Sequence, residues 1–94
     1  MVNKRLTDAI WPTPRLIRAA RGLAGIDQST LAQLAGVSRQ AVIAVERDEN
    51  ATMDFRRIEV LRKLQVVLEN DFGIEFQKAT RNSGAGVRFR NPES

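Results

Sequence analysis

Apolar residues recur at three- and four-residue steps over four stretches of this 94-residue chain, and at two-residue steps over two short ones. The longer period predicts amphipathic helices and the shorter one predicts strands. Helices are expected over residues 14–23, 28–35, 39–46 and from residue 53 or 54 to residue 70, and strands over 74–77 and 87–90. The pattern predicts a mainly helical fold with a small C-terminal strand pair.

Capping residues mark the ends of these segments. N-cap side chains stand at Thr13, Asp27 and Ser38, each before an apolar period. Glycines follow three of the helices, at residues 22 and 25, at 36 and at 73, where a helix end often needs positive φ. The chain therefore divides into an arm (1–13), a helical domain (14–72), a strand pair (73–91) and a tail (92–94).

The helical stripes predict the core. Its expected members are Leu16, Ile17, Ala20, Leu23, Leu31, Leu34, Val37, Val42, Val45, Phe55, Ile58, Val60, Leu61, Leu64, Val67 and Leu68. The last stripe is broader than four helices need, which points to a partner subunit. A two-stranded hairpin alone is marginal in water, so the strands are expected to pack on the last helix or to pair with a second chain. Their apolar positions, the candidate dimer contacts, are Ile74, Phe76, Val87 and Phe89.

The stretch from Asp27 to Glu46 holds two short helices joined by a turn centred on Gly36. Ser38 caps the second helix, and Arg39 and Gln40 follow in its first turn. Arginine and glutamine can each make two hydrogen bonds to the edge of one base. The pattern is that of a helix-turn-helix whose second helix enters the DNA major groove.

Composition narrows the choice of function. Hydrophobic residues make up 43% and charged residues 28% of the chain, which is typical of a globular domain. The net charge is +4, with the excess at the two ends, and this favours a polyanionic partner. Absence of cysteine and histidine removes disulfides, thiolate zinc sites and imidazole catalysis, and we expect no metal and no cofactor. No apolar run is long enough to cross a membrane and no signal peptide is visible, so the expected location is the cytoplasm, at the nucleoid.

Residues 16–64 resemble the helix-turn-helix domain of the Cro and lambda/434-repressor superfamily, also called the XRE family. The matching residues are Arg21, Gln28, Leu31, Ala32, Gly36, Val37, Ser38, Val42, Val45, Glu46 and Phe55. The resemblance implies a lambda-repressor-like domain of four to five helices, here with a C-terminal β-hairpin. The ending departs from the repressors, where a fifth helix is usual, and is similar to short stand-alone bacterial regulators with a strand pair.

The resemblance also implies roles for individual residues. Base contacts would come from Arg39, Gln40, Ile43 and Ala44, and phosphate contacts from Gln28, Ser29, Ser38 and Arg47. Lys4 and Arg5 could act as an arm that enters the minor groove, or could form a solvated tail. Arg21 and Glu46 match positions that form a structural ion pair.

Three functions follow, in order of preference. The first is a homodimeric repressor that binds double-stranded DNA at an inverted repeat. The second is an antitoxin that represses its own promoter and binds a toxin; an antirepressor is a related protein partner. The third, an enzyme, rests only on Asp48, Glu49 and Asp54, which have no base or metal ligand beside them. No enzymatic activity is therefore expected. These three carboxylates would also repel phosphate unless they turn away from it.

Overall fold

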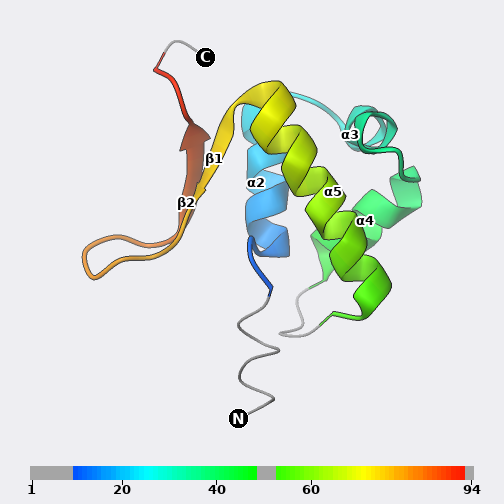
Figure 1. The fold of residues 1–94 in the computed structure, drawn as a ribbon, viewed down its shortest axis with the longest axis horizontal. Helices are drawn as coiled ribbons and strands as arrows, with labels where there is room; N and C mark the ends of the chain where they lie inside the picture. Colours follow the sequence, from blue (N-terminus) through cyan, green and yellow to red (C-terminus); the bar gives the residue numbers. More distant parts are fainter. Residues whose placement is uncertain (1–9, 49–52, 93–94) are drawn as a thin grey trace.

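The computed structural model describes residues 10–48 and 53–92. Within them the chain forms four helices followed by an antiparallel strand pair (Figure 1). The elements are α2 (Pro14–Ala24), α3 (Gln28–Ala35), α4 (Arg39–Arg47), α5 (Phe55–Phe72), β1 (Ile74–Gln77) and β2 (Gly86–Phe89). The sequence prediction is confirmed to within two residues at the element ends, and the second strand begins and ends one residue earlier than expected.

Each helix begins where a side chain caps it. The carboxylate of Asp27 accepts a hydrogen bond from the backbone N–H of Thr30 at 2.8 Å, and that of Asp54 accepts one from Arg57 at 2.8 Å. Thr13 and Ser38 cap α2 and α4 in the same way. These bonds satisfy backbone N–H groups that have no partner inside the helix.

Glycine in the left-handed conformation ends three of the helices. Gly25, Gly36 and Gly73 have φ values of 74°, 72° and 67°. Residues with a Cβ rarely adopt this conformation, so a glycine at these points allows a sharp change of direction. Gly22, expected to help end the first helix, lies inside α2 instead.

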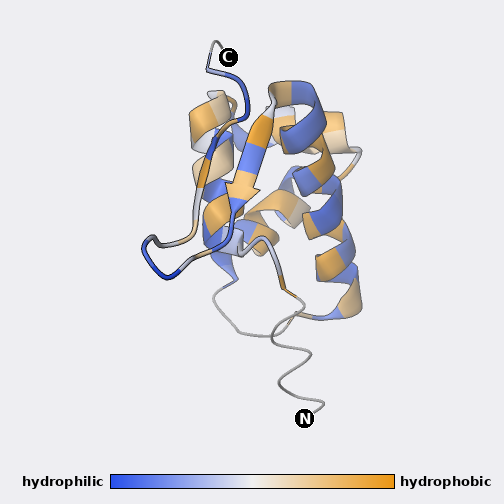
Figure 2. Cartoon of the chain, turned by 60° about the vertical axis from the view of Figure 1, so that its left-hand side comes forward, coloured by the Kyte–Doolittle hydropathy of each residue, from blue (hydrophilic) through white to orange (hydrophobic). Residues whose placement is uncertain are grey.

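One core joins all four helices and the strand pair. Its buried apolar members are Ile17, Ala20, Leu31, Ala32, Val42, Val45, Leu61, Leu64, Val67, Leu68 and Ile74. Figure 2 shows apolar and polar positions alternating along β1. The face of the hairpin with Ile74 and Phe76 packs against this core, in contact with both α2 and α5.

Three residues expected in the core are exposed. Leu23 is 41%, Leu34 is 48% and Phe55 is 75% exposed. Each lies in the first or last turn of its helix, where the neighbouring helices no longer reach the side chain. Periodicity gave the correct face of each helix but not the length over which that face is covered.

Ile74, one of the four expected dimer contacts, is not available to a second chain. Its side chain is fully buried in the core of its own chain, so it has no surface to offer a partner. Phe76, Val87 and Phe89 pack on the core while remaining partly exposed. Opposite this face, Arg88 Nε lies 3.0 Å from Glu75 Oε1.

Candidate nucleic-acid interface

The turn between α3 and α4 is held by backbone bonds and by the core. The N–H of Val37 donates to the carbonyl of Ala32 at 3.0 Å, which closes the end of α3 around Gly36. Leu31 on α3 and Val42 on α4 are both fully buried, so the two helices are fixed against each other. This arrangement is a helix-turn-helix with α4 as its second helix.

The first turn of α4 presents polar side chains to solvent. Arg39 and Gln40 are exposed, and within residues 10–48 and 53–92 neither side chain has a hydrogen bond or an ion pair. Ile43 and Ala44 are half-buried one turn further on. The exposed end of α4 therefore has two uncommitted side chains that can meet base edges, with a smaller apolar surface beside them.

The residues expected at phosphates lie in different surroundings. Ser29 and Arg47 are exposed, while Gln28 is half-buried. The Ser38 hydroxyl accepts a hydrogen bond from the N–H of Ala41 at 3.1 Å, so it caps α4. Gln28 donates from Nε2 to Glu46 Oε1 at 3.1 Å, a contact that was not predicted. One N–H of this amide is thus engaged inside the protein.

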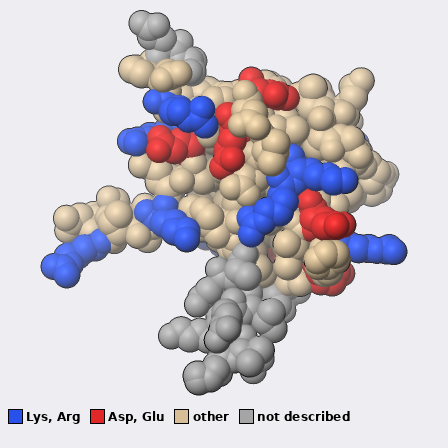
Figure 3. All heavy atoms as spheres, viewed as in Figure 1, with Lys and Arg blue, Asp and Glu red and all other residues tan. Residues whose placement is uncertain are grey.

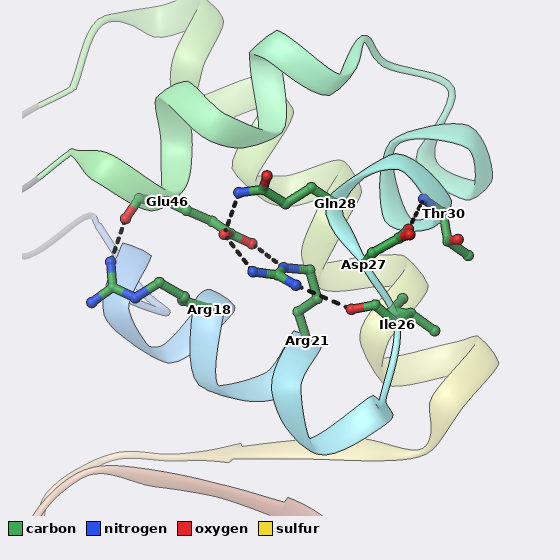
Figure 4. Close-up of polar contacts among 7 residues, drawn as sticks. All are labelled: Arg18, Arg21, Ile26, Asp27, Gln28, Thr30 and Glu46. Atoms are coloured by element: carbon green, nitrogen blue, oxygen red, sulfur yellow. Dashed lines mark hydrogen bonds and ion pairs between the residues drawn. The ribbon is translucent and has the colours of Figure 1, made fainter.

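The buried residue Glu46 is the centre of a polar cluster, defined here as Arg18, Arg21, Gln28 and Glu46 (Figure 4). Arg21 donates from Nε to Glu46 Oε2 at 2.7 Å and from Nη2 to Oε1 at 3.0 Å, a bidentate ion pair. Arg18 donates from Nη1 to the backbone carbonyl of Glu46 at 2.6 Å. Three helices thus meet at the C-terminal end of α4.

The environment of this cluster favours charge. Glu46 is 3% exposed, and both of its carboxylate oxygens accept hydrogen bonds. The hydrogen bond to Glu46 raises the pKa of Arg21, although partial burial acts in the opposite direction. A further bond, from Arg21 Nη1 to the carbonyl of Ile26 at 3.1 Å, holds the loop between α2 and α3. The ion pair therefore fixes the orientation of α4 relative to the rest of the domain.

The acidic residues after α4 are turned inward or used as caps. The Asp48 side chain is 2% exposed, and its Oδ2 accepts a hydrogen bond from Arg57 Nη1 at 3.0 Å. Asp54 caps α5. Two of the three carboxylates expected to repel phosphate are therefore engaged within the protein, and Glu49 lies outside the described residues. The sequence signal that could have indicated the ion pair of Asp48 is the basic residue Arg57, three positions after Asp54.

The segment before α2 is attached to both α5 and the hairpin loop. Arg62 Nη1 donates a hydrogen bond to the carbonyl of Trp11, and Lys78 Nζ lies 5.5 Å from the centre of the Trp11 ring. The indole therefore takes part in a cation–π contact. The candidate arm residues Lys4 and Arg5 lie outside the described residues.

Charge is distributed over the visible face without one dominant patch. In Figure 3, acidic and basic groups are interspersed over the helices, while basic side chains project from the hairpin loop. In the described part of the chain there is no cluster of three or more histidine, cysteine, aspartate or glutamate residues that could hold a metal ion. The described helices include none that is long and apolar enough to span a bilayer.

These features define a DNA-binding domain of the helix-turn-helix class. A helix-turn-helix family model, HTH_3, matches residues 17–69. The chain belongs to this family, the Cro/C1-type or XRE regulators, whose members are DNA-binding regulators and not enzymes. No curated protein matches the chain.

Proposed function

We propose that the protein is a transcriptional repressor that acts as a homodimer on an inverted repeat. The observation that carries the proposal is the contrast along α4: its C-terminal end is fixed by Glu46, while Arg39 and Gln40 at its N-terminal end make no hydrogen bond or ion pair in the described chain. A recognition helix needs this combination of a fixed axis and free side chains. The cytoplasm is the expected site of action.

Base reading is assigned to four residues of α4. Arg39 suits guanine and Gln40 suits adenine, because each offers a bidentate match to atoms in the major groove. Ile43 and Ala44 would contact thymine methyl groups. Half-burial of both side chains supports this limited role, since only part of each surface faces outward.

Phosphate contacts are assigned to Gln28, Ser29, Ser38 and Arg47. The first turns of α3 and α4 present backbone N–H groups and the positive end of the helix dipole, which favour an anion. Gln28 is already bonded to Glu46, so this bond would fix its amide for the remaining N–H to meet phosphate. Lys4 and Arg5 are proposed as arm contacts.

Dimerisation follows from the size of the site. One recognition helix covers only a few base pairs, and two related by a two-fold axis read an inverted repeat with half-sites about 34 Å apart. The alternative, an antitoxin, needs a segment that can wrap a toxin. In this chain β1 and β2 pack on the core, so no specific observation favours that function.

Selection of bound fragments from genomic DNA at physiological salt tests the proposal. The natural chain is compared with Gln40→Ala and with Gln33→Ala, which removes an exposed glutamine from the last turn of α3. Recovery of an inverted repeat by the natural chain and the control, but not by Gln40→Ala, would support a base-reading dimer. Recovery of only non-specific DNA by all three would refute it.

A further inference from the structure

The outer edge of β2 carries unpaired backbone groups. Gly73 and Arg90 face each other, because the N–H of Arg90 donates to the carbonyl of Gly73 at 2.7 Å. Hydrogen-bonded and non-hydrogen-bonded pairs alternate along an antiparallel ladder. The groups of Arg88 therefore point toward β1, and the N–H and carbonyl groups of Val87 and Phe89 point away from it.

One face of β2 packs on the core beside α2, and its outer edge is the edge away from β1. In Figures 1 and 2 β1 lies on the side of α5 and β2 forms the outside of the hairpin. Figure 4 shows the same order from another side, with β2 beyond β1. Among residues 10–48 and 53–92, no backbone hydrogen bond joins this edge to another segment. An open edge of this kind is a template for another strand.

We propose that β2 pairs antiparallel with β2 of a second copy, with the two-fold axis at Val87. The two hairpins then form one four-stranded sheet with the order β1, β2, partner β2, partner β1. The proposal rests on the homodimer of the proposed function and adds the surface and the register by which the two copies meet.

The direction of the backbone groups limits the register. Outward-pointing residues must lie opposite outward-pointing residues, because otherwise their N–H and carbonyl groups do not meet. A two-fold axis within β2 must then coincide with one of four residues: Gly86, Val87, Arg88 or Phe89. These four registers differ in what Arg88 and Phe89 meet across the axis.

Charge excludes the two registers nearest the C-terminal end. An axis at Arg88 places this side chain directly opposite the partner's Arg88. An axis at Phe89 places Arg88 opposite the partner's Arg90. Like charges directly opposite one another on a sheet are destabilising, and each Arg88 has only one Glu75 beside it.

The loop excludes an axis at Gly86. In that register Phe89 would lie opposite the partner's Ser83. Both backbone groups of Ser83 are already bonded inside its own loop: its carbonyl accepts from the N–H of Thr80 at 2.8 Å, and its N–H donates to Thr80 Oγ1 at 3.1 Å. Pairing with Phe89 would break both bonds.

The axis at Val87 satisfies every outward group of β2. Val87 exchanges two hydrogen bonds with the partner's Val87, and Phe89 pairs with the partner's Ala85. Arg88 then lies beside the partner's Gly86, which has no side chain and no charge. A Cβ built at Gly86 meets no atom within 4 Å, so the outer face has room for the arginine.

The occupant of the edge is therefore a second copy of this chain. A partner strand must place a small or acidic residue opposite Arg88 and free backbone groups on either side of it. β2 itself meets both conditions at Gly86, Val87 and Ala85. Val87 and Phe89 are partly exposed in the single chain and would gain apolar neighbours across the axis.

Single cysteines test the register directly, because the natural chain has none. Residues directly opposite in an antiparallel pair have Cα atoms about 4.5–5.5 Å apart, within the range a disulfide accepts. Under mild oxidation Val87→Cys should form a covalent dimer, and an equimolar mixture of Gly86→Cys and Arg88→Cys should form mixed dimers. Gly86→Cys or Arg88→Cys linked efficiently to itself would overturn the register.

Charge at Gly86 gives a second test that needs no oxidation. Gly86→Glu places a carboxylate beside the partner's Arg88 twice per dimer, and the dimer dissociation constant should fall about 2- to 30-fold. Gly86→Arg should raise it by a similar factor. The controls Gln33→Glu and Gln33→Arg make the same charge changes at an exposed position of α3, outside the hairpin, and should have little effect.

Sedimentation equilibrium on the full chain measures these constants without DNA. A chain that is monomeric at 100-fold the concentration that saturates DNA, or Gln33 variants with a larger effect than the Gly86 variants, would overturn the proposal. Disulfide formation at residue 87 without specific DNA binding would support the interface and refute the repressor. A dimeric repressor that fails both tests would keep its function and place its interface elsewhere.

Discussion

Arg21 and Gln28 are the same two residue types as Arg39 and Gln40, and the fold uses the two pairs in opposite ways. Arg21 and Gln28 both donate to the carboxylate of Glu46, which is 3% exposed. Arg39 and Gln40 are exposed and have no hydrogen bond within the described chain. The contrast shows that burial and an available acceptor decide whether an arginine or a glutamine of this domain is bonded inside the fold.

The largest effect is expected from breaking the buried pair. Glu46→Ala leaves the Arg21 guanidinium and the Gln28 amide without their shared acceptor. Removing one partner of a buried ion pair costs about 3–5 kcal/mol, and we expect about 2–4 kcal/mol because Arg21 remains partly exposed. Urea denaturation followed by circular dichroism measures this change in the free energy of unfolding.

The double variant Arg21→Met with Glu46→Met is the matched control. It removes both charges and fills similar volume, so it should be more stable than Glu46→Ala. Equal losses in the two variants would mean that the ion pair is not what fixes α4. The cluster would then be ordinary packing and the contrast with Arg39 would fail.

The opposite behaviour is expected at the exposed pair. Arg39→Ala or Gln40→Ala should cost about 1–3 kcal/mol in binding to the cognate site and little on random DNA. The free energy of unfolding should change by no more than about 0.5 kcal/mol, because both side chains are exposed and neither makes a hydrogen bond or an ion pair in the described chain. Fluorescence anisotropy and urea melts measure the two quantities on the same variants. Equal binding losses on cognate and random DNA would assign these residues to phosphate.

Asp48 tests whether a second buried carboxylate behaves like Glu46. Asp48→Asn weakens the bond to Arg57, which joins the end of α4 to α5. We expect a loss of about 1–2 kcal/mol, smaller than at Glu46, since the Arg57 side chain is 39% exposed and solvent screens the pair. Urea melts of Asp48→Asn and Glu46→Gln give the comparison, and a larger loss at Asp48 would reverse the order.

The N-cap of α3 should depend on pH, whereas the N-cap of α4 should not. This difference is the smallest expected effect. The N–H of Thr30 donates to Asp27 and holds the pKa of this carboxyl below its ordinary value of 3.8. A lowered pKa in the folded chain means that the cap stabilises the protein at higher pH and loses this contribution as the pH falls through the folded pKa. Ser38 does not titrate in this range.

Asp27→Asn isolates the contribution, because asparagine caps a helix equally well without a titrating group. The natural chain should lose more stability than this variant on acidification from pH 5 toward pH 2. Thermal melts across that range measure the difference. Parallel curves for the two proteins would contradict the assignment.

The bounds of the helices could be predicted from the sequence because the signals for their ends are local. Asp27, Ser38, Gly36 and Gly73 act within five residues of their own positions, so a linear sequence is enough to interpret them. The ion pair of Arg21 and Glu46 came from the family resemblance. Exposure of the large apolar side chains at helix ends, such as Phe55, depends on how far a neighbouring helix extends, which periodicity does not record.

Contacts between distant segments were the part that could not be foreseen. The bonds from Arg18 and Gln28 to Glu46 join residues 28 and 18 positions apart. No spacing rule links such residues, because their meeting depends on the angles between three helices. For the strands, packing on the last helix and pairing with a second chain were both expected, because an alternating strand shows that one face is apolar but not what covers it. Burial of Ile74 corresponds to the first alternative.

Because several donors bond to Glu46, this residue fixes one end of α4 and thereby controls the position of the other end. Gln40 lies six residues away, about 9 Å along the helix axis, so a tilt of about 10° at Glu46 would move the far end by about 1.5 Å. A hydrogen bond to a base edge does not survive a displacement of that size. If Gln40 reads bases as proposed, a substitution that loosens Glu46 would weaken the base contacts of Gln40. Such a substitution would lower binding to the cognate site although the substituted residue does not touch DNA.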